Sequence, residues 1–379
     1  MNWQSYRALF PISSTHAFLN HASISPLNAR VAEAIQGWLT RLQQAPFDEL
    51  HGDLERLMSE WRQRAARLIN AAQPAEIVPM PDTATGINTA ANSLPLRPGD
   101  NVLVLEGDYP ANIYPWLNLA PRGILVKWVP QHAGGLDLER LVARIDRRTR
   151  VIALSTVMFA TGFRNDLAAV GALCRERGIF FVVDAIQSLG ALPLDVQACG
   201  IDMLAAGGQK WLLSTPGSGL FYCRQELIDE LQLGAYVGAA SVVDPFNFLD
   251  YNFTLQPSAD RFVLGTPNLL NIVALHAALG LLLEIGISAI AERILALTDH
   301  LIAALEEHGI AVRSNREPAH RSGIVIAAVA QPEATAARLL AEGIVVSARG
   351  GGLRIAPHFY NTAQDLDRLV AALVGARSA

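Results

Sequence analysis

The chain has 379 residues, 51% of them hydrophobic and 17% charged, and its formal net charge is −5. This composition is typical of a well-packed globular protein and argues against disorder, while the negative charge argues against nucleic acid or an anionic membrane as a partner. The three cysteines lack metal-ligand spacing and favour a reducing compartment over a disulfide framework. We expect a cytoplasmic protein without a bound metal.

Neither the N-terminus nor the most apolar region predicts membrane targeting. The first 16 residues lack a basic start and a long apolar stretch, so we expect no signal peptide. Region 272–297 is strongly apolar but contains His276, Glu284 and Glu292. These polar residues favour a buried or interface helix over a membrane span.

The middle of the chain alternates strand patterns with helical ones. Four apolar runs fit strands: 101–106, 123–129, 150–157 and 179–185. The last is continuously apolar, as expected of a strand that is buried on both faces. Residues 166–178 have helical spacing and end in Gly178, a typical helix C-cap. Strands alternating with helices predict an α/β fold with a mostly parallel sheet.

After residue 265 the pattern changes to long helices over 268–308, short strands within 323–329 and 343–349, and a final helix over 363–375. We interpret this region as a smaller α+β domain. The expected boundaries are 16–264 for a large domain and 265–379, together with 1–15, for the small one.

Lys210 is unusual because the chain has only one other lysine, Lys127, among its 30 basic residues. It lies between two short strand patterns, 203–207 and 219–223. A desolvated lysine can lose its proton, and a neutral amine attacks a carbonyl to form a Schiff base. The alternative is a surface lysine that escaped replacement by arginine.

Asp184 directly follows an apolar strand, and ligands of open parallel sheets bind at the carboxyl ends of strands. An acid there can hold a protonated ring nitrogen of a cofactor such as pyridoxal phosphate, and Gln187 could reach the same site. The alternative for Asp184 is a helix cap.

Phosphate-binding turns are also indicated. Residues 81–94 read as a turn that opens into a helix capped by Asp82 or Thr83, which would leave the amides of Ala84, Thr85 and Gly86 free for phosphate. An ordinary capped helix is the alternative. The turn at 265–268 opens a helix and is a second candidate.

Two further candidates are Tyr109 and Arg354. Tyr109 follows a strand and either stacks on a cofactor ring or belongs to the core. Arg354 follows a glycine-rich loop, and it either grips a carboxylate or makes a surface ion pair.

Taken together, the order and spacing of these residues resemble the class V aminotransferases, which are fold type I pyridoxal-phosphate enzymes, over nearly the whole chain. The most specific stretches are VVDAIQSLGALPLDV, DMLAAGGQKWLLSTPGSGLFY, RFVLGTPN and LRIAPHFYNT. The resemblance implies a large, mostly parallel sheet domain with a smaller α+β C-terminal domain, and pyridoxal 5′-phosphate as the cofactor.

The resemblance also implies roles around the cofactor ring. Lys210 matches the lysine that forms the Schiff base, Asp184 the partner of the pyridinium nitrogen, and Gln187 the group near the ring hydroxyl. Tyr109 stands where many members have a stacking histidine.

Further roles implied by the resemblance concern the phosphate and the substrate. Ala84 and Thr85 match the phosphate-binding turn, and Gln209 replaces a histidine that is common before the lysine. Gly265 and Thr266 match a turn that reaches the phosphate from the neighbouring subunit, which implies a homodimer. The matching substrate-side residues are Arg354, which would bind the carboxylate, and Asn20 and His21, which would border the substrate.

Two departures from the cysteine desulfurases of this family narrow the choice of reaction. Cysteine desulfurases of this family need a cysteine shortly before the carboxylate-binding arginine, and residues 340–356 contain none. Phe159 stands where many desulfurases have asparagine, which resembles the isopenicillin N epimerase-like branch. That branch includes transaminases, C–S lyases and epimerases.

We expect transamination of an amino acid, with a C–S β-lyase or an epimerase as the alternatives. A catalytically silent pyridoxal-phosphate-binding protein is less favoured, because the chain has no basic patch for a DNA-binding role. A nucleotide-binding enzyme lacks support, since neither a G-x-G-x-x-G after the first strand nor a G-x-x-x-x-G-K-[ST] motif is present.

Overall fold

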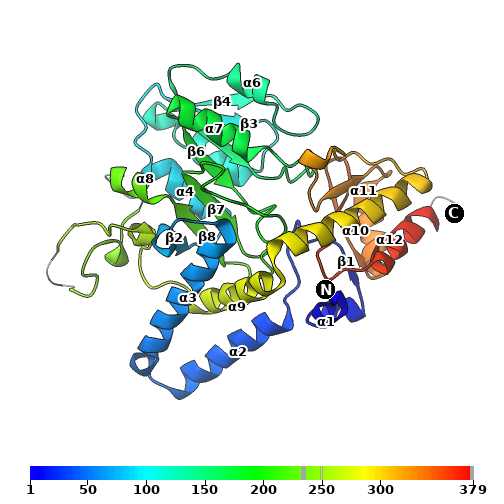
Figure 1. The fold of residues 1–379 in the computed structure, drawn as a ribbon, viewed down its shortest axis with the longest axis horizontal. Coiled ribbons are helices and arrows are strands. Elements are labelled where there is room, and N and C mark those ends of the chain that lie inside the picture. The colour runs from blue at the N-terminus through cyan, green and yellow to red at the C-terminus, as the bar shows by residue number, and fades with distance from the viewer. Residues whose placement is uncertain (232–235, 248, 250, 376–379) are drawn as a thin grey trace.

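The computed structural model describes residues 1–231, 236–247, 249 and 251–375. Its centre is a seven-stranded sheet in the order β2-β8-β7-β6-β5-β3-β4 (Figure 1). These strands are β2 (Ile77–Pro79), β3 (Asn101–Leu105), β4 (Leu125–Val129), β5 (Thr149–Ser155), β6 (Phe180–Asp184), β7 (Met203–Gly207) and β8 (Gly219–Cys223).

The sheet is mostly parallel, as the sequence predicts. Strands β4, β3, β5, β6 and β7 run parallel, whereas β8 is antiparallel to β7 and to β2. The carboxyl ends of the parallel strands therefore lie at one edge of the sheet. Ser155, Asp184 and Ala205 are register partners across β5, β6 and β7 near this edge.

Helices cover both faces of the sheet because its strands are apolar on both sides. Phe181 and Val183 of β6 belong to the core formed with α3, α7 and α9, whereas Val182 belongs to the core formed with α4, α5 and α8. The helices of this part are α2 (Ala29–Gln44), α3 (His51–Ile69), α4 (Thr83–Ser93), α5 (Tyr114–Leu117), α6 (Leu138–Val142), α7 (Leu167–Arg177), α8 (Gln225–Glu230) and α9 (Leu269–Ile285).

The C-terminal part forms a smaller unit with its own sheet. Its antiparallel strands, in the order β11-β12-β9, are β9 (Val325–Ala327), β11 (Ser347–Arg349) and β12 (Gly352–Ile355). Its helices are α10 (Ile287–Glu307), α11 (Pro332–Ala341) and α12 (Ala363–Gly375). Figure 1 shows these elements gathered to one side of the large sheet.

The first residues of the chain join this smaller unit. Helix α1 (Trp3–Arg7) is attached through an ion pair between Arg7 and Asp365, and β1 (Ala17–Phe18) pairs in parallel with β10 (Ile344–Val345). This arrangement places residues 19–25, which follow β1, between the two parts of the molecule (Figure 1).

The long helical region after residue 268 is broken at Gly286, whose φ of +89° interrupts the helix between α9 and α10. Helix α9 packs against α2 and α3, which belong to the segment that we assigned to the large domain. The boundary at residue 265 stays a prediction. Within the described ranges, no single helix is long and apolar enough to cross a membrane, and only α9 and α10 taken together, bent by 79°, meet those two criteria.

Candidate active site

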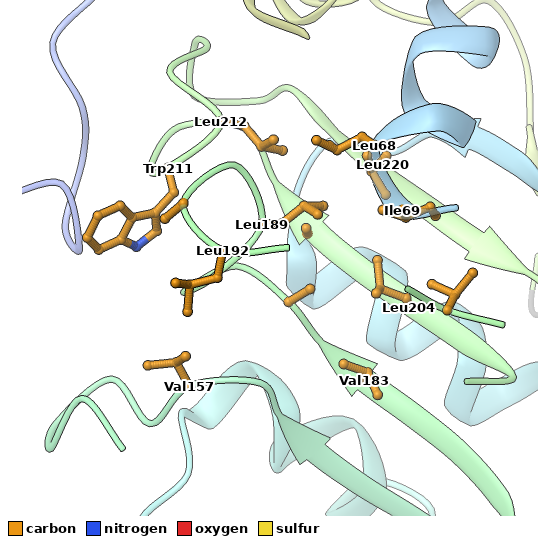
Figure 2. Close-up of a cluster of buried hydrophobic side chains, with 14 of the residues drawn as sticks. Leu68, Ile69, Val157, Val183, Leu189, Leu192, Leu204, Trp211, Leu212 and Leu220 are labelled. Atoms are coloured by element: carbon orange, nitrogen blue, oxygen red, sulfur yellow. The ribbon is translucent and has the colours of Figure 1, made fainter. Parts of the chain in front are cut away.

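Lys210 lies in a tight turn that follows β7 at the carboxyl edge of the sheet. The Gly208 amide donates to the Ser218 carbonyl at 2.6 Å, and the Ser214 amide donates to the Gly208 carbonyl at 2.9 Å. The next residues, Trp211 and Leu212, are buried in the core, where they are seen near Leu189 and Leu192 (Figure 2). This anchoring holds the lysine in one place.

The environment of Lys210 favours a neutral amine. Its side chain is buried, with 9% exposed, and burial lowers its pKa to about 8, an effect that Asp184 opposes and Arg354 reinforces. A lysine with this pKa is partly deprotonated near pH 8 and can act as a nucleophile or a base. Lys127 instead pairs with Asp146 at 2.5 Å on the half-exposed strand β4, so the surface interpretation applies to Lys127 and not to Lys210.

Asp184 is a buried carboxylate with one unused oxygen. It ends β6, and its Oδ1 accepts a hydrogen bond from the Ile186 amide at 2.9 Å. Its Oδ2 is buried without a hydrogen-bond partner in the described part of the chain, and burial raises the pKa of this carboxyl to about 7. An unpaired buried acceptor is costly. A protonated ring nitrogen would supply the missing donor, so Asp184 fits pyridoxal phosphate.

The Gln187 amide is committed to protein contacts. It donates to the Ala22 carbonyl at 3.1 Å and accepts from Trp211 Nε1 at 3.1 Å. It therefore connects the N-terminal segment to the turn that carries the lysine. Its expected place beside a cofactor hydroxyl stays a prediction.

Tyr109 lies at the site and not in the core. Its side chain is 43% exposed, and its ring centroid is 5.5 Å from Lys210 Nζ. The ring also makes an edge-on contact with Phe159, at 5.2 Å between centroids. An aromatic ring in this position can cover a cofactor bound to the lysine.

The expected phosphate-binding turn is partly used by the protein itself. Asp82 caps α4, and its Oδ1 accepts from the Thr85 amide at 2.7 Å, while the Gly86 amide donates to the Asp82 carbonyl. Of the three amides that we expected to be free, Thr85 is therefore engaged by the N-cap carboxylate and Gly86 by the backbone carbonyl of the same residue. No described group accepts from the Ala84 amide.

Three other residues were expected near the cofactor phosphate. Gln209 has a buried Oε1 for which the described residues offer no partner, and its carbonyl accepts from the Ser25 amide at 2.7 Å. Gly265 and Thr266 are exposed and line a cavity of about 300 Å³ together with Thr85 of the same chain. Their contact with a neighbouring subunit stays a prediction.

Arg354 is a buried cation without an acidic partner among the residues that the structure places. It lies on β12 with 3% of its surface exposed, and it donates to the Phe159 carbonyl at 3.1 Å and to Ser23 Oγ at 2.6 Å. Arg354 Nε is buried and makes no hydrogen bond to any residue that the structure describes. Burial lowers the pKa of Arg354 to about 10. A buried charge needs a counter-ion. A substrate carboxylate would provide one in bidentate geometry.

The two N-terminal candidates have different positions. Asn20 Oδ1 accepts from Ser23 Oγ at 2.9 Å, so Asn20 lies behind the serine that contacts Arg354. His21 was expected to border the substrate, but it is fully buried, and its ring nitrogens contact the Ala356 carbonyl and the Tyr360 hydroxyl, both at 2.9 Å. Burial lowers its pKa to about 4. His21 therefore serves as an internal support and has no free ring nitrogen for a ligand.

Two residues of the site were missed by sequence reasoning. Asp108 is a second buried acid just after a parallel strand, the same signal that identified Asp184, and it could have been found in that way. Ser23 gave no signal, because a serine in an irregular segment is common and its contact with Arg354 spans 331 residues of sequence.

Comparison with known proteins agrees with this geometry. The family model described as Aminotransferase class-V matches residues 17–369. The uncharacterized aminotransferase YcbU of Bacillus subtilis is 30% identical over 367 residues, which cover 96% of this chain and 95% of that protein.

Solved structures share the fold. The cysteine desulfurase CsdA of Escherichia coli is 26% identical with a TM-score of 0.87, and the match covers 100% of this chain and 99% of CsdA. A mutant of C-DES, with glycine covalently linked to its PLP cofactor, has a TM-score of 0.88 at 23% identity, covering 97% and 98% of the two chains. The fold is therefore fold type I, and the family, together with the fit at Lys210 and Asp184, supports pyridoxal phosphate as the cofactor. The chain belongs to the class V aminotransferase family.

Proposed function

We propose that the protein is a pyridoxal-phosphate-dependent enzyme that acts on the α carbon of an amino acid, and that its main reaction is transamination. The observation that carries this proposal is a set of three buried groups with incomplete partners. Lys210 is a desolvated amine. Among the residues that the structure describes, Asp184 has an oxygen without a hydrogen-bond donor and Arg354 has no acidic partner. An amino acid and the cofactor together would complete all three.

Each residue then has a separate task. Pyridoxal phosphate, when bound, supplies an electron sink for the negative charge that develops at Cα. Asp184 would hold the proton on the ring nitrogen, and Arg354 would bind and orient the substrate carboxylate. Lys210 Nζ would remove and return the α proton as a general base and acid. Tyr109 would cover the ring and limit the access of water.

The structure argues against a cysteine desulfurase that uses a persulfide. The segment 340–356, which includes β10, β11 and β12, has no cysteine. Cys174 and Cys223 are buried, and burial raises the pKa of the Cys174 thiol to about 12. Cys223 is the register partner of Met203 at the start of β7, so it lies at the edge opposite Lys210.

A C–S β-lyase is the second candidate, because cysteine desulfurases are among the relatives and elimination of a β substituent needs no enzymic cysteine. An epimerase is the third, on the resemblance at Phe159. A silent binding protein is disfavoured, since the chain keeps Lys210, Asp184 and Arg354, and all three are buried.

The test is a titration of the cofactor-loaded enzyme with a panel of amino acids, with identification of the products. Transamination predicts one keto acid released per site, together with conversion of the cofactor to its amine form. Catalytic release of pyruvate or sulfide would instead show a β-lyase, and a change of configuration at Cα would show an epimerase. Either result contradicts transamination.

The proposal also includes a cytoplasmic homodimer in which Gly265 and Thr266 approach the neighbouring cofactor. Sedimentation of the loaded enzyme measures the assembly state, and a monomer with full activity contradicts this part.

A further inference from the structure

Asp108 is a second buried carboxylate at the edge of the sheet that carries Lys210. It follows β3 and is 7% exposed. Its Oδ1 accepts from the Tyr109 amide at 2.7 Å and from Ser155 Oγ at 2.5 Å. Its Oδ2 accepts from the Ser155 amide at 3.1 Å and from Asn112 Nδ2 at 3.0 Å. Both oxygens are therefore fully used.

Asp108 and Asp184 have opposite surroundings. Three of the four groups that contact Asp108 are N–H donors that cannot accept a proton, so this set of partners matches an ionised carboxylate. Asp184 has one donor and a free oxygen. Burial raises the pKa of Asp108, and its four hydrogen bonds oppose that effect by stabilising the charged form. Of the two buried acids, Asp108 is the one whose partners favour the anion, and Asp184 is the acid that is available to a ligand. Such pairs of acids in different environments are typical of functional sites.

The contacts of Asp108 lead directly to the site. Tyr109, whose amide it binds, carries the ring near Lys210 Nζ, and Ser155, which it binds twice, is the register partner of Asp184. The negative charge of Asp108 raises the pKa of Asp184, and the charge of Lys210 lowers it.

We propose that Asp108 is a positioning residue of the cofactor site: it fixes Tyr109 over Lys210, and its buried negative charge beside Asp184 favours the proton on the ring nitrogen of bound pyridoxal phosphate. This inference depends on the cofactor part of the proposed function and not on transamination. In this inference two carboxylates provide the negative charge of the site. Asp184 would contact the cofactor, and Asp108 would lie behind Asp184.

The test compares Asp108→Asn with Asp100→Asn. Asp100 is also buried and also binds a backbone amide, that of Arg97, but it lies at the opposite end of β3. Each protein is loaded with pyridoxal phosphate, and the visible absorbance of the lysine-linked cofactor is followed against pH. Loss of a nearby negative charge disfavours protonated forms, so D108N is expected to lower the midpoint by about one pH unit. D100N should leave the midpoint unchanged, and equal shifts in both variants overturn the inference.

A second measurement uses the cofactor-free protein. It distinguishes charge repulsion between Asp108 and Asp184 from a purely structural effect of each substitution. In a double-mutant cycle at pH 8, D108N and D184N should be non-additive in the free energy of unfolding, because each removes the repulsion felt by the other. Additive effects contradict the inference.

If D108N fails to fold, Ser155→Ala provides the test. It removes the Oγ donor that lowers the pKa of Asp108, so a larger fraction of Asp108 is protonated and part of its negative charge is lost. The midpoint should therefore shift in the same direction as in D108N by a smaller amount, whereas an unchanged midpoint assigns Asp108 a purely structural role. If the wild-type enzyme releases no keto acid but these shifts are observed, transamination fails and the inference about Asp108 stands.

Discussion

Asp184→Asn should stabilise the cofactor-free protein at pH 8, even though it damages the cofactor site. The fold raises the pKa of Asp184 from 3.8 to about 7, so the folded state binds this proton more tightly than the unfolded chain does. The stabilising contribution is complete below pH 4 and is lost as the pH rises towards 7. At ~1.4 kcal/mol per unit, the loss is about 4 kcal/mol. Asparagine does not ionise, so D184N avoids this loss of stability.

This value already includes the attraction between Asp184 and Lys210, which lowers the pKa of Asp184. The assay is urea denaturation of the cofactor-free wild type and of D184N at pH 5 and pH 8. We expect the difference in the free energy of unfolding, in favour of D184N, to grow from pH 5 to pH 8. The affinity of D184N for pyridoxal phosphate should be lower than that of the wild type. An advantage that is absent or that shrinks as the pH rises would refute the reasoning.

Three further outcomes are expected. Lys210→Ala should abolish the visible absorbance of lysine-linked cofactor and Lys127→Ala should retain it, so loss in both variants contradicts the assignment. Arg354→Gln should raise the KM for the amino acid by about 10- to 100-fold, the value of a charged hydrogen bond, and an unchanged KM excludes carboxylate binding. Gly86→Ala should cost about 1–3 kcal/mol and lower the Tm, because a Cβ there would lie 2.5 Å from Ala205 Cβ; an unchanged Tm shows that α4 can shift.

The parallel sheet was predictable because its signals are local. The apolar runs became β3, β4, β5 and β6, and Gly178 ends α7 with a φ of +62°, as a C-cap glycine should. The antiparallel placement of β2 beside β8 was not predictable, since three residues carry too little pattern to show which strand they join. The strand that carries Arg354 was missed for a similar reason, because it is short and directly follows a run of glycines.

The chemistry of the site was easier to predict than its supports. Lys210, Asp184 and Arg354 could be proposed from the sequence because few side chains can perform the tasks that we assign to them. The internal hydrogen bonds of His21 were not predicted, because its partners lie more than 330 residues away in the sequence and only the fold reveals them. The capping of the Thr85 amide by Asp82 was one of two options in the sequence, and the structure decides it.

The short segment 22–25 has a consequence for the synthesis of the protein. It binds Gln187 through Ala22, Gln209 through Ser25, and Arg354 through Ser23. The last pair is 331 residues apart, so a ribosome adding ~5–20 residues per second needs roughly 20 s to a minute between making the two ends. Once residue 210 has been made, the nascent chain has its lysine and its acid, but it still lacks Arg354, the residue that we propose binds the substrate carboxylate. Arg354 is therefore made well after the lysine and the acid, and a chain released before it would lack the proposed carboxylate-binding group.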